Sequence, residues 1–437
     1  MTTSKKLNRL DLTALAIGNV IGGGIMSLLG LSIGLTGRSV VISIIICTVM
    51  VFISCLPQIF SVGTLQVEGG FYTQASFFGG KKLGGIYTLI FITYFFSASL
   101  YALSFADYVL SFIPTANTKV ISISLLTVLL LFNIKGVKVA ARVQNILVVL
   151  LIIALLSFGI MGTGHIQPDF FKEPGFITRG YSGIMVATSL MSFATVGSAF
   201  VVNFSAYCEN PKKDIPFAII VSSIVVGIIY ILVAFVAAGV FPIEHVANKP
   251  LSITAREVLP TPVYIFFMIF GAMAALVTSL NALLGWITPP IIMACKDGWL
   301  PKSLAVCNKK FGTPHRILLL VYIFTVAIIL NGLNLNSVAN ISDFLSNCAM
   351  SVVTFSLIRM PSIIPEHWNN SAFRIKNSLY YFITIMGTLM TVIFCYFMAK
   401  ELSFKELVCT FVYLGISMLY VHFRAPKVKD ADIMEKI

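Results

Sequence analysis

Apolar runs close to membrane-spanning length recur along the whole chain, separated by short polar connections. A helix needs about 20 apolar residues to cross the hydrocarbon core of a bilayer. Lipid-exposed backbone tolerates little besides helices and closed barrels, so the pattern predicts an all-α polytopic membrane protein. The twelve predicted transmembrane helices cover residues 11–33, 40–63, 85–113, 119–134, 142–163, 181–205, 216–240, 261–294, 316–331, 337–358, 378–398 and 404–423.

The first and the sixth of these runs contain residues that interrupt a helix at mid-membrane depth. Gly22, Gly23 and Gly24 follow one another in the first run, and each glycine costs a helix about 1 kcal/mol relative to alanine. The sixth run carries a small, polar stretch at 192–199, which includes Gly197. Interruptions at corresponding positions of two halves are typical of transporters built from inverted repeats, with the substrate bound between them.

The spacing of the two interruptions predicts a single transporter domain, residues 1–437, in which helices 1 and 6 are unwound. A five-helix repeat is expected at about 11–163, its inverted counterpart at about 181–358, and two extra helices at about 378–423. Close helix packing is the alternative explanation, because small residues also let membrane helices approach one another. The recurrence of the feature five helices later favours a binding site.

Composition and charge support the same class. The chain is 58% apolar and 11% charged, against about 45–50% and about 25% in soluble domains. With the N-terminus inside, the net charge of +13 is distributed unevenly, with 22 of the 30 Lys and Arg on the inner side. This bias predicts a multi-pass protein of the cell membrane with both termini cytoplasmic, in contact with lipid and with no nucleic-acid partner. The eight outer residues are Arg38, Lys119, Lys172, Arg179, Lys249, Arg256, Lys400 and Lys405.

The residues that usually carry enzyme chemistry are scattered. The eight cysteines show no metal or redox spacing, and the glycine run lacks the Gly-Lys-Ser/Thr ending of a phosphate-binding loop. We therefore predict no enzyme, with no catalytic residue, no metal site and no cofactor beyond a coupling ion. The five histidines all fall in connections or at helix ends: His165, His245, His315, His367 and His422.

Four short sequence blocks lie at helix boundaries in a fixed order: IGGGI at 21–25, EGGFY at 68–72, ENPKKDIP at 209–216, and DGWLP at 297–301 followed by FGTP at 311–314. In this order they resemble the amino-acid permeases of the amino acid–polyamine–organocation superfamily, over nearly the whole chain. The resemblance implies the LeuT-like inverted-repeat fold. It also implies a secondary active transporter that moves amino acids by alternating access. A non-transporting amino-acid sensor on the same fold is the alternative that the sequence leaves open.

The resemblance also places an amino-acid substrate at the two interruptions. Freed N–H groups at a half-helix N-terminus attract a carboxylate, which implies Gly22, Gly23 and Gly24 for the substrate carboxylate. Freed carbonyl groups would accept hydrogen bonds from the substrate ammonium. Phe193 falls where several relatives carry an aromatic gate, although packing in the core or against lipid is the alternative. The other implied substrate-binding residues are Ile21, Ala194, Thr195, Val196 and Gly197.

Two carboxylates, Asp107 and Asp343, fall inside predicted helices. Both are expected near a helix end, where an interfacial or capping role is the simpler explanation. The segments expected to line the pocket then carry no acidic side chain. Because a cationic substrate side chain buried without a counter-charge is costly, we expect a neutral amino acid.

The coupling ion remains open between Na+, H+ and amino-acid exchange. Thr278 and Ser279 resemble the hydroxyl pair that holds sodium in symporters of the same fold, together with carbonyl groups of helix 1. Here these would be the carbonyls of Gly18 and Ile21. Hydrogen bonding of both hydroxyl groups to their own helix is the alternative. The lysine that many relatives carry in helix 5 is absent, since Leu151 stands there.

Overall fold

The computed structural model describes residues 6–66, 68–135, 137–172, 175–333 and 335–428, without the side chains of 137–143. Over these residues the chain is all-helical, apart from one isolated β-bridge between Leu7 and Cys208. The elements up to residue 207 are α1 (Arg9–Val20), α2 (Gly23–Thr36), η1 (Gly37–Ser39), α3 (Val40–Thr64), α4 (Gly70–Gly79), α5 (Lys81–Ile92), α6 (Phe95–Leu110), α7 (Thr118–Lys135), α8 (Val137–Gly162), η2 (Thr163–His165), α9 (Gly180–Thr195) and η3 (Val196–Tyr207). The later elements are α10 (Pro211–Gly239), α11 (Ile243–Val246), α12 (Ser252–Val258), α13 (Thr261–Phe266), η4 (Phe267–Met273), α14 (Ala274–Trp286), α15 (Thr288–Asp297), η5 (Lys302–Ala305), α16 (His315–Leu330), α17 (Leu335–Ser356), η6 (Leu357–Arg359), α18 (Met360–Ile363), α19 (Pro365–Asn369), α20 (Asn377–Glu401), α21 (Phe404–Arg424) and η7 (Ala425–Lys427).

Ten helical stretches among the described residues are long and apolar enough to cross a membrane, and α16 is a shorter apolar helix. The first stretch, Arg9–Thr64, joins α1, α2 and α3 and therefore contains two of the predicted helices. Each predicted helix coincides with a helical part of the structure, which confirms the all-α membrane class. The number of membrane crossings and the inverted repeat stay predictions.

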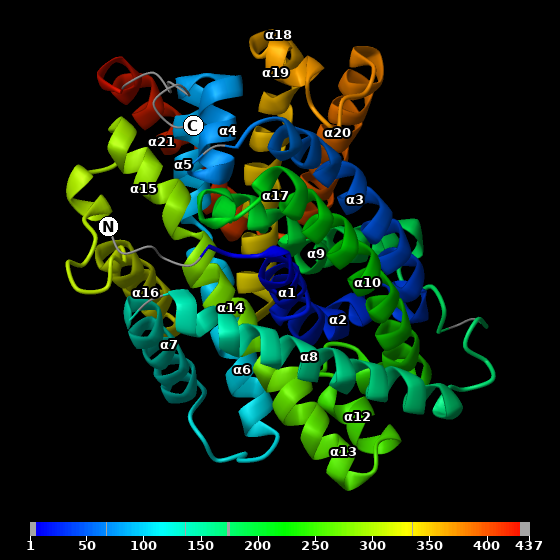
Figure 1. Cartoon of the computed structure of the whole chain (residues 1–437). Coiled ribbons are helices and arrows are strands. Elements are labelled where there is room, and N and C mark those ends of the chain that lie inside the picture. Colours follow the sequence, from blue (N-terminus) through cyan, green and yellow to red (C-terminus); the bar gives the residue numbers. More distant parts are fainter. Residues whose placement is uncertain (1–5, 67, 136, 173–174, 334, 429–437) are drawn as a thin grey trace.

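The broken first helix lies at the centre of the bundle (Figure 1). α1 packs against α8, α10, α14 and η3, while α2 packs against α9. α21 lies on the periphery, and its exposed side chains are largely apolar, as Phe411 and Leu419 illustrate. In a bilayer such side chains face lipid, so α21 adds to the outside of the bundle and leaves its centre to the earlier helices.

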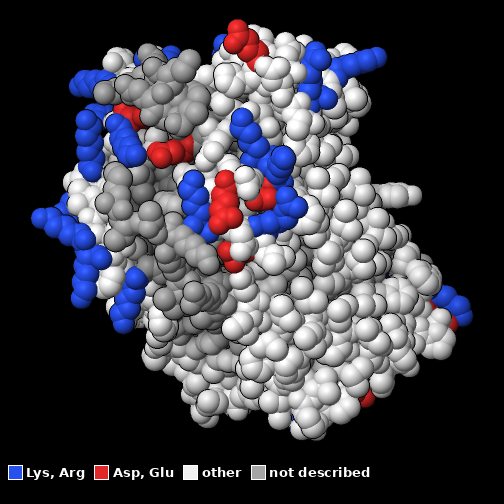
Figure 2. Space-filling view, viewed as in Figure 1, with Lys and Arg blue, Asp and Glu red and all other residues white. Residues whose placement is uncertain are grey.

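Connections predicted for the same side of the membrane meet at the same end of the bundle. One end contains the hydrogen-bonded pairs Leu7–Tyr207, Ile134–Thr313 and Gly298–Arg424. The other end contains the pairs Arg38–Gln167, Lys119–Leu330 and Arg179–Glu401. Lys and Arg gather over the part of the molecule that contains both termini, whereas the part around α12 and α13 carries few charges (Figures 1 and 2). This uneven distribution of Lys and Arg agrees with the predicted alternation of inner and outer connections between the helices. The cytoplasmic placement of the termini stays a prediction.

Helix 8, expected as one helix at 261–294, is divided into four elements. A π-helix, η4, separates α13 from α14, and α14 ends at Trp286. α15 restarts at Thr288 with Pro289 and Pro290 in its first turn, where the missing N–H of proline has no helical partner to lose. The two prolines account for the second division. The π-helix has no proline or glycine at its start and was not predictable from such signals.

Gly30 lets α2 touch the connection between α11 and α12. The Asn248 N–H donates to the Gly30 carbonyl at 2.8 Å, and a β-carbon on Gly30 would overlap the carbonyl oxygen of Lys249. Asn248 adopts a positive φ of 58°, which costs energy for a residue other than glycine. A backbone atom cannot rotate away from an added methyl group, so this contact depends on glycine.

We therefore expect Gly30→Ala to lower the stability of the protein by about 1–3 kcal/mol, as overpacking typically does. Thermal unfolding of the purified protein in detergent measures the effect. Gly415→Ala in α21 is the matched control, because nothing lies within 4 Å of a β-carbon built there. Equal melting temperatures for the two variants would contradict the proposed contact.

Candidate functional site

Helix 1 breaks at Ile21 and Gly22. Ile21 has a ψ of 83°, Gly22 has a φ of −154° and a ψ of −126°, and α2 starts at Gly23. The Gly22 N–H donates to the Val20 carbonyl at 2.9 Å, so one turn-like hydrogen bond survives within the break. All of these residues are buried. The predicted interruption of helix 1 is confirmed, and it is two residues long.

Helix 6 differs from the expectation. α9 ends at Thr195 and continues directly as the 3-10 helix η3, which runs for 12 residues from Val196. The expected unwinding therefore takes the form of a tighter helix, in which the backbone hydrogen bonds change pattern without a gap. Runs of 3-10 helix longer than three or four residues are uncommon and often mark a hinge or a strained segment. The change begins inside the predicted interruption at 192–199.

The three glycines of helix 1 each allow a close contact with a different neighbour. A β-carbon on Gly22 would overlap the Ser279 hydroxyl, one on Gly23 would overlap the Tyr101 ring, and one on Gly24 would overlap Ala194. The structure thus brings Gly24 of helix 1 and Ala194 of helix 6 together, and their contact with a substrate stays a prediction. The absence of a side chain at these positions is what lets the helices meet.

Two buried side chains join the break in helix 1 to helix 6. The Asn19 amide donates to the Gly197 carbonyl at 2.7 Å and accepts from the Trp286 indole N–H at 3.0 Å. The Tyr230 hydroxyl lies 2.5 Å from the Val20 carbonyl and 3.3 Å from the Ala194 carbonyl. Sequence reasoning did not assign these residues. The signal for Asn19 was present, since a side-chain amide beside a glycine run at membrane depth needs a partner.

The four predicted ion-binding residues make different contacts. The Ser279 hydroxyl donates to the Gly18 carbonyl at 3.1 Å and lies 3.4 Å from the Gly23 nitrogen. The Thr278 hydroxyl instead donates to the Ala275 carbonyl of its own helix at 2.8 Å. Ile21 is buried within the break. Ser279 and Gly18 therefore come together, whereas the Thr278 hydroxyl follows the own-helix alternative.

Aromatic rings lie on both sides of the break. Tyr101 and Phe193, with ring centroids 5.9 Å apart, lie on the side of Gly23 and Gly24. On the side of Asn19, Phe200 stacks on Trp286 with centroids 4.1 Å apart. Phe193 is thus placed against a second ring beside the glycine run, and its gating role stays a prediction.

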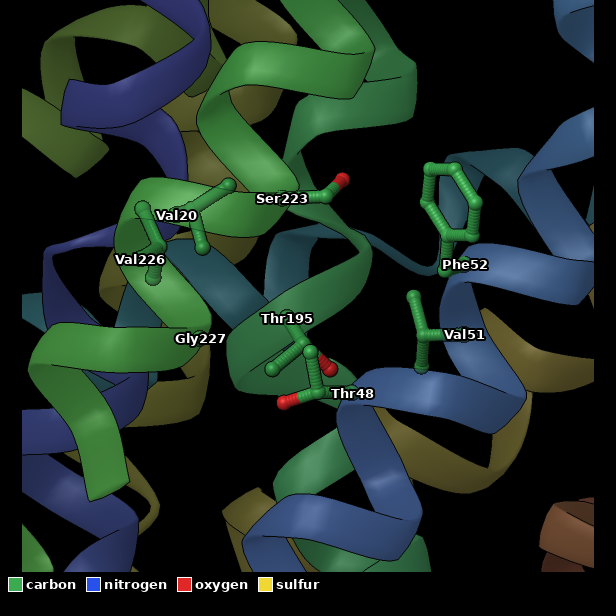
Figure 3. Close-up of a pocket in the computed structure, with 8 residues that line it drawn as sticks. All are labelled: Val20, Thr48, Val51, Phe52, Thr195, Ser223, Val226 and Gly227. Atoms are coloured by element: carbon green, nitrogen blue, oxygen red, sulfur yellow. The ribbon is translucent and has the colours of Figure 1, made fainter.

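Thr195 and Val196 lie where helix 6 changes its winding, and the Thr195 side chain contacts α3. Its hydroxyl donates within its own helix and lies 3.2 Å from the Cys47 thiol of α3. It also lines a pocket of about 10 Å³ between α1, α3, α9 and α10 (Figure 3). Such a volume admits one water molecule at most. Val196 is buried, and its predicted contact with a substrate remains untested.

The two predicted carboxylates have different environments. Asp107 is partly exposed and lies three residues before the end of α6, as expected. Asp343 is fully buried, and the expectation of an interfacial role is wrong for it. Its Oδ1 accepts from the Asn347 amide at 3.0 Å and from the Ser192 hydroxyl at 3.4 Å. The predicted start of this helix was within two residues of α17, so Asp343 is buried by the packing of α6, α9 and α20 around α17, which hydropathy does not report.

The sequence matches the family described as "Amino acid permease" over residues 7–419. Two similar proteins come from Bacillus subtilis (strain 168). The branched-chain amino acid permease BcaP is 26% identical over 339 residues, covering 71% of each chain. The methylthioribose transporter is 27% identical over 389 residues, covering 83% of this chain and 82% of its own. The cadaverine/lysine antiporter of Escherichia coli (strain K12) is 22% identical over 452 residues, covering 98% and 97%.

Replacement of Asn19 by alanine tests the link between the two breaks. Asn19→Ala would leave the Gly197 carbonyl and the Trp286 N–H buried without this partner, at a cost of about 1–3 kcal/mol for each group. We expect a lower melting temperature in detergent and weaker substrate binding. The control is Asn331→Ala at the exposed end of α16, where the amide bonds only to its own helix. Melting temperatures that agree between the two variants would remove Asn19 from this role.

Proposed function

The chain belongs to the amino acid permease family, and from that membership we propose a secondary active transporter that moves amino acids by alternating access. The relatives named above are a permease, a transporter and an antiporter, so nothing in the comparisons favours a non-transporting sensor. The observation that carries the proposal is the buried break at Ile21 and Gly22, held against the change of winding in helix 6. The distribution of Lys and Arg further supports a cell-membrane protein with both termini in the cytoplasm.

The proposed substrate is a neutral amino acid. The first N–H groups of α2, at Gly23 and Gly24, would bind its carboxylate, because the first turn of a helix has donors without a partner in their own helix and a positive dipole end. The Gly23 N–H donates to the Ser279 hydroxyl at 3.4 Å, at the long end of hydrogen-bond distances. The carbonyls of Val20 and Ala194 already accept from the Tyr230 hydroxyl, so the substrate ammonium needs other acceptors nearby. We therefore assign the ammonium to the carbonyls of Ile21 and Phe193. The relatives' names specify different substrates, so the uncharged rings of Tyr101 and Phe193 are the support for a neutral side chain.

Uptake into proteoliposomes tests the proposal directly. We expect a radiolabelled mixture of neutral amino acids to accumulate under at least one of three driving forces: a sodium gradient, a proton gradient, or internal amino acid alone. Protein-free liposomes are the control. Substrate binding without uptake under any driving force would replace the transporter with a sensor, and the absence of both would contradict the proposed substrate class.

A second test concerns Ser279. Ser279→Ala removes the hydroxyl that joins Gly18 to Gly23, and we expect a loss of about 1 kcal/mol, or roughly fivefold in apparent substrate affinity. Thr278→Val is the comparison, because its hydroxyl bonds to its own helix, and a smaller effect is expected there. If sodium drives uptake, the sodium dependence should shift more in Ser279→Ala. Equal shifts in both variants would restore Thr278 to the ion site.

A further inference from the structure

Asp343 is a buried ionisable group that the proposed transport cycle does not yet use. We propose that its carboxyl group is a proton-binding site that couples amino-acid transport to a proton gradient. This proposal rests on the transport function proposed above and extends it by naming the coupling ion and the residue that carries it.

The two oxygens of Asp343 have unequal surroundings. Oδ1 accepts from the Asn347 amide at 3.0 Å and from the Ser192 hydroxyl at 3.4 Å. Oδ2 is buried and accepts no hydrogen bond of ordinary geometry from the described residues, although the backbone N–H of Phe193 faces the carboxyl group. An ionised carboxylate would leave charge on an unsolvated oxygen, at a much higher cost than a neutral group. The arrangement fits a protonated acid whose proton is on Oδ2 and whose carbonyl oxygen is Oδ1.

The surroundings of Asp343 in the described structure are uncharged. Within the described part of the chain it forms no ion pair with Lys, Arg or His. The titratable groups that face it are Cys395 of α20, Tyr94 of α6 and Cys47 of α3. All three are neutral when protonated, so their ionisation would repel a negative charge on Asp343. A proton is thus the simplest cation that can neutralise this carboxyl group while the interface remains dry.

The position of Asp343 connects it to the proposed substrate site. Ser192, which bonds to Asp343, immediately precedes Phe193, and Ala194 packs against Gly24. On its other side, α17 is joined to α6 by the Ser97–Ser342 and Tyr94–Ser346 hydrogen bonds, at 2.7 Å and 2.8 Å. Asp343 therefore lies on a helix, α17, that is joined to α6 on one side and contacts α9 on the other. α9 carries half of the proposed site.

These contacts give the proton a defined role in the cycle. While Asp343 is protonated, α9 and α17 can pack without water between them. Loss of the proton from Oδ2 creates a carboxylate that needs water or another donor, which favours separation of α9 from α17. When the bundle opens to one side, Oδ2 binds a proton from water; when it opens to the other, the O–H bond breaks and water accepts the proton. Water on the two sides of the membrane supplies and accepts the proton, so the step needs no further reactant.

Asp343→Asn tests the proposal, because asparagine has nearly the same shape and mimics a carboxyl group that cannot release its proton. In wild-type proteoliposomes, an inward proton gradient should support accumulation of about tenfold per pH unit for one coupled proton. In Asp343→Asn, the internal and external concentrations should become equal. Exchange of labelled for unlabelled amino acid at equal pH should continue and lose its pH dependence. Asp107→Asn in α6 is the matched control, and it should retain the wild-type accumulation.

A readout that does not require transport is the infrared spectrum of the purified protein. The difference between wild type and Asp343→Asn should contain the C=O stretching band of a protonated carboxyl group at neutral pH. Absence of that band, or proton-driven accumulation that survives in Asp343→Asn, would overturn the proposal. Selective loss of cationic substrates with unchanged pH dependence would make Asp343 a counter-charge and would also overturn it.

The outcomes separate this proposal from the transport function. A wild-type protein that exchanges amino acids but ignores a pH gradient retains the function and loses the proton site. A wild-type protein that neither exchanges nor accumulates any amino acid loses the function itself. An Asp343→Asn variant that fails to bind substrate would be replaced by Asp343→Glu, which keeps a titratable group and should retain proton-driven accumulation at a reduced rate.

Discussion

The structure depends on one constraint, the need to satisfy backbone polar groups where a helix is broken inside an apolar environment. Water cannot reach these groups in a bilayer, and each unsatisfied group costs several kcal/mol. The break in helix 1 meets this constraint with side chains from other helices: Tyr230 at the Val20 carbonyl and Ser279 at the Gly18 carbonyl. Asn19 does the same for the Gly197 carbonyl of helix 6. Tyr230, Ser279 and Asn19 are therefore partners of the breaks.

The two broken helices meet the constraint in different ways, and the difference follows from their residues. Helix 1 has consecutive glycines, which let the chain leave helical geometry at Gly22 and restart the helix one residue later. Helix 6 has Gly197 alone, followed by residues with side chains, and it keeps a hydrogen-bonded 3-10 path from Val196 onwards. A 3-10 turn has poorer hydrogen-bond geometry than an α-turn. The cost of changing between the two windings is therefore smaller than that of opening an intact α-helix.

The sequence was sufficient for the membrane class, the helix positions and the break in helix 1, because each depends on local composition. Glycines in an apolar run lower the stability of a helix directly, whatever surrounds them. The partners of the breaks could not be predicted, because Asn19, Tyr230 and Trp286 meet only through the packing of helices 1, 7 and 8. The same limit explains Asp343 and Thr278. Both lie within helices as expected, but the burial of the carboxyl group and the direction of the hydroxyl depend on neighbours distant in sequence.

The glycine contacts also indicate how the proposed site can open. Gly23 meets the ring of Tyr101, a side chain that can change rotamer, whereas Gly24 meets the Cα atom of Ala194. A ring can move within a fixed backbone, but a contact with a Cα atom separates only when one helix moves relative to the other. Access to the first N–H groups of α2 therefore requires two motions of different size: rotation of Tyr101 and displacement of α9 from α2. Because Ser192 lies on α9, the second motion also disturbs its hydrogen bond to Asp343, so one displacement changes the surroundings of both the amino-acid site and the buried carboxyl group.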